Sequence, residues 1–142
     1  MKIASAMICE FASVREGLMT IVGGGITRIW TPTLPAPLNL WLALQIDLEP
    51  DELDLPHEVR IKVLDPKDHQ IAEVAAGFQP FKHPKYEEGE HGIVPFPVNL
   101  APVSLASRGR HTLEIYFGKD KVTIRQLWVQ HPDEKELPSL RE

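Results

Sequence analysis

The chain has 142 residues, of which 43% are hydrophobic and 25% are charged, so it has the size of one domain and enough apolar residues for a core. Its formal net charge is -5 with basic residues spread singly, which argues against a nucleic-acid partner, because phosphate neutralisation needs a positive surface. A single cysteine, Cys9, excludes an internal disulfide, and no stretch approaches the roughly 20 apolar residues of a membrane span, so we expect a cytoplasmic protein without a membrane segment.

The N-terminal third predicts two strands. Residues 2–11 read as a strand that is apolar on both faces and hence central, and Glu10 interrupts the apolar run that a signal peptide would need. Residues 13–17 form a turn, and a second strand runs over residues 18–30 with Gly23, Gly24 and Gly25 inside it. A phosphate-binding loop would need a Lys-Ser/Thr pair and a helix after the glycines, so we interpret them as a bulge or sharp bend.

A strict two-residue alternation follows. Every even position from 38 to 48 is Leu or Ile, which places all of these side chains on one face of a strand and would scatter them around a helix. Apolar and polar residues alternate over 57–78 on both sides of an Asp-Pro turn, and this pattern predicts a β-hairpin. The proline-rich residues 31–37 before these elements predict an extended connection.

The second half of the chain predicts a long loop, an edge strand and another hairpin. Residues 79–92 are irregular, and Pro95 and Pro97 alternate with apolar residues over 94–100, which indicates an edge strand because proline cannot donate to a ladder. Residues 100–107 could hold one helical turn. Apolar and polar residues alternate over 112–129 on both sides of a turn at 118–121, and this pattern predicts the second hairpin. Both faces of its second strand are expected to be covered near the end of that strand.

These elements together predict an all-β fold. We expect an antiparallel β-sandwich of about eight strands, immunoglobulin-like or C2-like, over residues 1–131. The polar tail, residues 132–142, is expected to fray.

No pattern of residues points to catalysis, a metal or a cofactor. The best grouping of metal-ligating types lies in the long loop, but it lacks the short-spaced pairs of a zinc site; it contains His83, Glu87, Glu88, Glu90 and His91. No Gly-x-Ser-x-Gly elbow is present, and Cys9 falls at a strand position where a thiol acts as a small hydrophobe. We therefore predict no enzyme activity and no bound cofactor, although a triad assembled by the fold would leave no local signature.

Exposed aromatic residues give the best candidate binding surface. Phe81 and Tyr86 lie in the long loop as apolar anchors, with His83 and His91 at the rim. Trp41 lies on the polar side of the strand over residues 38–48, where it is either exposed or covered by the second sheet or the loop.

The chain also resembles a family of short uncharacterised bacterial proteins. The resemblance lies in Ala-Met-Ile-Cys-Glu-Phe-Ala at residues 6–12, Val-Arg-Glu-Gly-Leu at 14–18, Ile-Val-Gly-Gly-Gly at 21–25 and Ile-Trp at 29–30, and continues at residues 63–65 and 109–129. It implies a bacterial cytoplasmic β-sandwich. It implies no activity, and no catalytic residue is carried over.

The leading functional prediction is a non-enzymatic interaction module that binds a protein partner or itself through loop 79–92. The alternative is a β-sandwich that binds a small ligand or metal with the same loop. Fold alone does not choose between them.

Overall fold

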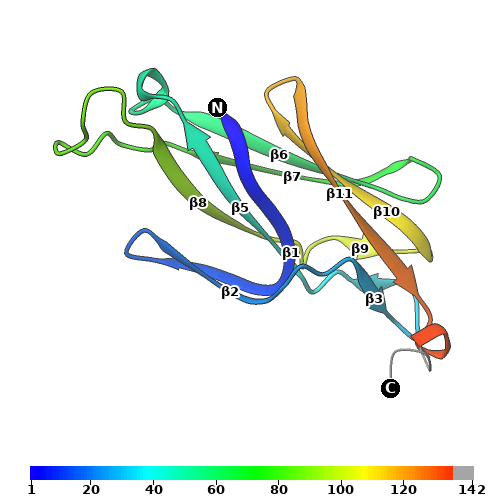
Figure 1. Cartoon of the computed structure of the whole chain (residues 1–142). Coiled ribbons are helices and arrows are strands. Elements are labelled where there is room, and N and C mark those ends of the chain that lie inside the picture. Colours follow the sequence, from blue (N-terminus) through cyan, green and yellow to red (C-terminus); the bar gives the residue numbers. More distant parts are fainter. Residues whose placement is uncertain (136–142) are drawn as a thin grey trace.

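The alternating segment 38–48 forms a strand in the middle of the molecule over its last eight residues. In the computed structural model, which describes residues 1–135, this strand is β5 (Trp41–Leu48) of a four-stranded sheet (Figure 1). Every even position from Leu38 to Leu48 is at most 8% exposed. Burying an aliphatic side chain of this size stabilises a fold by about 1.5–3 kcal/mol, so this one face anchors the core.

The described chain contains eleven strands and two short 3-10 helices. In order they are β1 (Lys2–Arg15), β2 (Leu18–Gly24), β3 (Arg28–Trp30), β4 (Ala36–Pro37), β5 (Trp41–Leu48), η1 (Pro50–Glu52), β6 (His57–Leu64), β7 (Gln70–Phe78), β8 (Gly92–Asn99), β9 (Ser104–Leu105), β10 (Gly109–Phe117), β11 (Asp120–Gln130) and η2 (Pro132–Lys135).

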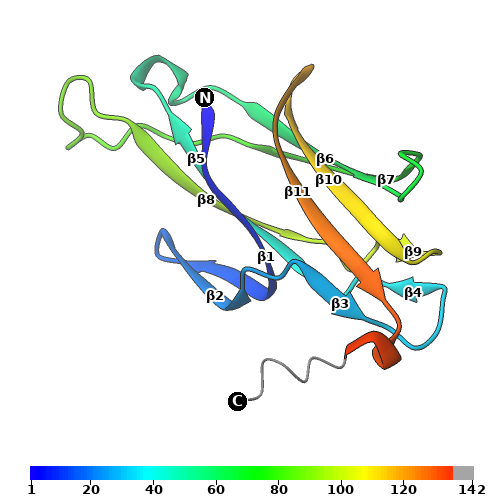
Figure 2. The same ribbon diagram turned by 45° about the vertical axis from the view of Figure 1, so that its right-hand side comes forward.

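Two main sheets hold most of the strands. One has the order β2-β1-β5-β8 and the other β3-β11-β10-β6-β7, while β4 and β9 pair separately (Figures 1 and 2). All of these pairs are antiparallel except β3 with β11. The predicted all-β fold is confirmed, as are both hairpins, β6–β7 and β10–β11, and the proline-bearing edge strand, β8.

A single large apolar cluster draws on both sheets. It joins Ile8 and Leu44 of the first sheet to Ile61 and Ile115 of the second, all fully or almost fully buried. At one side the sheets are joined by the rings of Phe78 and Phe96, whose centroids are 5.2 Å apart. At the other side Arg125 Nε donates to the Ala6 carbonyl oxygen at 2.9 Å.

The three glycines were predicted to form a bulge or a sharp bend within one continuous strand; the strand ends at Gly24, so they form a bend between two strands and not a bulge. The chain leaves the four-stranded sheet after Gly24 and joins the five-stranded sheet at Arg28, where β3 pairs in parallel with β11. Gly23 and Gly25 have φ of 60° and 84°, a region that residues with a Cβ rarely enter. The backbone N–H of Gly25 donates to Ile8 O at 3.0 Å, which fixes this crossing between sheets.

Other expectations differ in detail. β1 continues to Arg15, so its turn is confined to Glu16 and Gly17, and the strand count exceeds the expected eight because short β3, β4 and β9 carry little periodic signal. Residues 100–107 contain β9 and no helical turn. Trp128 remains partly exposed, so one face of β11 is open near its end. In the tail, η2 occupies residues 132–135, and residues 136–142 lie outside the described part.

Candidate interaction surface

The β1–β2 hairpin curls over the outer face of the four-stranded sheet. The first half of β1 pairs with β5 as far as Cys9, and the second half pairs with β2 from Cys9 to Arg15. A strand of this length twists, and each half follows a different partner. The hairpin therefore turns back until β2 contacts β8, although these strands are at opposite edges of the sheet.

Small side chains beneath the hairpin permit this close approach. Cys9, Ala12 and Ala43 are buried in a second cluster, with Met7, Met19 and Trp41 packed against them. The Cys9 thiol lies 3.6 Å from the Trp41 carbonyl oxygen. Desolvation by burial raises the pKa of the Cys9 thiol, so the group is a packing residue and a poor nucleophile.

A groove of about 630 Å³ separates the curled hairpin from β8. Leu18, Met19 and Ile21 line the hairpin side, and Ile93 and Pro95 line the β8 side. The groove is largely apolar, with Ser5 and Gln45 as polar lining residues. Such a surface binds apolar side chains far better than charged ones.

A smaller hollow of about 290 Å³ continues the groove toward loop 79–92. It shares Ile93 and Pro95 with the groove and adds three of the predicted binding residues, Phe81, His83 and Tyr86. Phe81 is 72% exposed, whereas Tyr86 packs against the main core. The ring centroids of His83 and Tyr86 are 6.1 Å apart. Sequence reasoning therefore grouped these three residues as the structure does.

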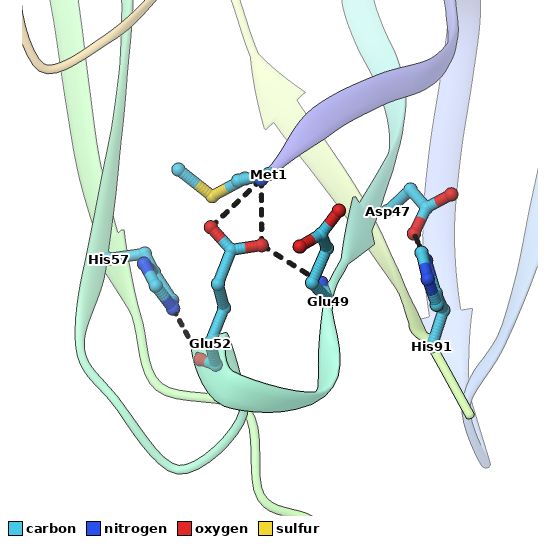
Figure 3. A network of polar contacts seen from close by, with 6 residues as sticks. All are labelled: Met1, Asp47, Glu49, Glu52, His57 and His91. Carbon is cyan, nitrogen blue, oxygen red and sulfur yellow. Dashed lines mark hydrogen bonds and ion pairs between the residues drawn. The ribbon is translucent and has the colours of Figure 1, made fainter. Parts of the chain in front are cut away.

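The other two predicted binding residues lie elsewhere. His91 Nδ1 is 2.7 Å from Asp47 Oδ1, so this side chain ties the end of the loop to β5 (Figure 3). Trp41 packs edge-on against Phe11, with ring centroids 5.3 Å apart. The cover of Trp41 thus comes from the β1–β2 hairpin and not, as the sequence suggested, from the second sheet or loop 79–92.

A polar network near His91 joins the start of β1 to η1 (Figure 3). The Met1 ammonium donates to Glu52 at 2.8 Å, the Glu49 backbone N–H donates to the same carboxylate at 2.8 Å, and His57 Nε2 lies 2.7 Å from the Glu52 carbonyl oxygen. Burial raises the pKa of Glu52, but these hydrogen bonds and the positive charge outweigh it, and the net pKa is lowered. The carboxylate is therefore occupied by structural contacts.

Residues 1–135 contain neither a metal-binding cluster nor a helix that could span a membrane. No three His, Cys, Asp or Glu side chains in this part of the chain are placed to hold a metal ion. Neither η1 nor η2 has the length and apolar character needed to cross a membrane.

The hairpin residues of the groove were missed at the sequence level. The sequence shows that residues 18–22 contain no charged residue. Such an apolar run fits a strand in the interior of a sheet as well as a strand at its edge. Ile93 falls out of phase with the core residues of β8, on the same face as Pro95 and Pro97, but the prediction began the strand at Val94 and left Ile93 out. The prolines indicated that β8 is an edge, whereas only the sheet order reveals that β2 is one as well.

The fold and surface together define an all-β protein with an apolar groove on one sheet. The chain belongs to a family of unknown function, DUF6941, whose model matches residues 4–130. No curated protein matches the chain. The family match supports the resemblance to an uncharacterised family over most of the chain and brings no activity with it.

Proposed function

We propose that this chain is a non-enzymatic self-assembly module of a bacterial cytoplasmic protein, and that β2 pairs edge to edge with β2 of a second copy. The two sheets around one core support a β-sandwich of the immunoglobulin-like or C2-like type. The observation that carries the proposal is the chemistry of β2 as a sheet edge.

The sheet edges differ in how they are protected from pairing. β8 carries Pro95 and Pro97, which remove two backbone donors. β3 has only three residues, and β7 carries Glu73, whose carboxylate is bonded to Arg60. By contrast, β2 has seven residues, Leu-Met-Thr-Ile-Val-Gly-Gly, without a charge or a proline. Natural proteins rarely leave such an edge uncovered in the monomer.

Apolar side chains are exposed on the hairpin that carries this edge. Leu18 is 75% exposed and Val22 is 48% exposed, and Phe11, the register partner of Val22 on β1, is exposed as well. In a two-fold antiparallel arrangement, β2 of one copy would lie against the same strand of the other. The absence of charges in β2 means that self-pairing meets no repulsion.

The test is the molar mass of the protein by light scattering across a range of concentrations, with and without a chelator. We expect a dimer that the chelator leaves unchanged. Val22→Lys places a charge at the edge without altering a buried residue, so we expect a monomer that keeps the circular dichroism spectrum of the wild type and unfolds cooperatively. Its melting temperature should no longer depend on protein concentration. Leu55→Lys is the matched control, since Leu55 is 50% exposed and belongs to the loop before β6 and not to a sheet edge, and it should remain dimeric.

A wild-type monomer at all concentrations would contradict self-assembly, as would a Val22→Lys variant that still dimerises. Dissociation by the chelator alone would instead favour the metal-binding alternative. Dissociation in Leu55→Lys but not in Val22→Lys would move the interface from β2 to the loop before β6.

A further inference from the structure

A second hollow lies at the seam between the two sheets, on the side away from the β8 edge. It is a cleft of about 580 Å³ lined by residues 6–8 of β1, 25–28 of the crossing segment and β3, and 124–126 with Trp128 of β11. These three strands converge there in both views (Figures 1 and 2). Within residues 1–135, β1 has no strand partner on this side before Cys9 and β11 has none before Trp128, so the seam stays open.

The charged residues that line the cleft are two arginines, Arg28 and Arg125, and no lining residue is acidic. Neither arginine forms an ion pair with a residue of the described chain. The cleft is therefore positively charged, although the formal net charge of the whole protein is -5.

Neutral acceptors hold both guanidinium groups in place. Arg125 donates through Nε to Ala6 O at 2.9 Å and through Nη1 to Ile124 O at 2.7 Å. Arg28 donates through Nη1 to Gln130 Oε1 at 2.9 Å. These bonds orient the groups without neutralising them, which lowers the entropy lost when an anion binds.

An indole ring provides the apolar part of the cleft. The Arg28 guanidinium carbon lies 5.8 Å from the Trp128 ring centroid, and Trp128 is partly exposed. Trp128 is in register with Arg28 on β3 and with Arg110 on β10, so it stands between two arginines on one face of the sheet. Exposed Ile124 extends the apolar surface along β11.

We infer that this cleft binds a small organic oxyanion with a flat apolar body. A guanidinium fork matches a carboxylate or phosphate group, and the indole face accepts a planar ring. The volume is within the range of small-molecule sites. A peptide strand fits less well, because the Arg125 side chain bridges the two sheets and blocks the gap between β1 and β11.

The test is an NMR titration of the labelled protein with four probes. Benzoate and phenyl phosphate carry both a ring and an oxyanion, benzamide is the neutral counterpart of benzoate, and acetate lacks the ring. We expect saturable shifts at residues 6–8, 25–28 and 124–128 with benzoate or phenyl phosphate, and the stronger of the two identifies the oxyanion. Benzamide and acetate should bind at least about tenfold more weakly, the loss expected for one charge-assisted hydrogen bond or one ring contact.

Variants separate the cleft from a general charge effect. Arg28→Gln and Arg125→Gln should each weaken binding about tenfold, whereas Arg15→Gln, which removes a charge from the hairpin tip, should leave it unchanged. Because Arg125 also joins the sheets, Arg28→Gln is the decisive variant if Arg125→Gln lowers the melting temperature. Any of four results would overturn the inference: benzoate and benzamide bind equally, the shifts are scattered over the surface, binding is not saturated by about 10 mM, or Arg28→Gln leaves the affinity unchanged.

Discussion

Adjacent residues of the β1–β2 hairpin should respond very differently to truncation. Met19 packs on the cluster of Cys9, Ala12 and Ala43, whereas Leu18 is 75% exposed at the tip. Truncating a fully buried methionine to alanine costs about 2–5 kcal/mol, and Met19 is only partly buried, so Met19→Ala should lower the free energy of unfolding by about 1–2 kcal/mol. Leu18→Ala should change it by less than about 0.5 kcal/mol.

The assay is urea denaturation followed by circular dichroism. Both changes are made in the Val22→Lys background, because self-association would otherwise add a concentration-dependent term to the stability. The slope of the free energy against urea should be the same for both variants. Equal losses for the two variants, or a loss below about 0.5 kcal/mol for Met19→Ala, would refute the packing of the hairpin on the outer face of the sheet.

Two further results are expected. The Cys9 thiol, whose pKa is raised by desolvation, should react with a thiol reagent only after denaturation, and rapid reaction of the native protein would show that the hairpin opens. The pKa of Asp65 is lowered, chiefly because the His69 N–H donates to its carboxylate at 2.9 Å and the Lys67 N–H adds a second bond. Because the pKa of Asp65 is lower in the folded protein, the carboxylate stabilises the fold above its ordinary pKa of 3.8, and this stabilisation is lost as the pH falls through the folded pKa. The melting temperature of Asp65→Asn should therefore lie below that of the wild type at neutral pH and converge with it in acid. A difference in melting temperature that stays constant with pH would exclude this linkage.

The elements with the strictest alternation were predictable from the sequence. The Leu and Ile positions of β5 bury one face, and the residues of β6, β7 and β10 also alternate between core and surface, because a strand places successive side chains on opposite faces. Pro95 and Pro97 identified β8 as an edge for an equally local reason. Phe81, His83 and Tyr86 were grouped correctly because they are close in the sequence.

The placement of distant segments was not predictable in this way. The glycines at 23–25 predicted a bulge or a sharp bend, because the positive φ that glycine tolerates is a local property. The sheet that the chain joins after them depends on the distant pairing of Arg28 with Trp128. The alternatives predicted for Trp41, exposure or cover by the second sheet or the loop, did not include Phe11, because nothing near Trp41 in the sequence indicates that Phe11 packs on it.

The sequence by itself determined that this protein is all-β, which face is buried in β5, β6, β7 and β10, and that one edge strand contains prolines. Only the tertiary structure decided that β2 is a sheet edge, that its hairpin curls toward β8, and that Arg28, Arg125 and Trp128 line one cleft. The physical reason is range: side-chain alternation and backbone dihedrals act between neighbours in the chain. Sheet order and the seam between sheets arise from contacts between residues about a hundred positions apart, such as Ala6 and Arg125.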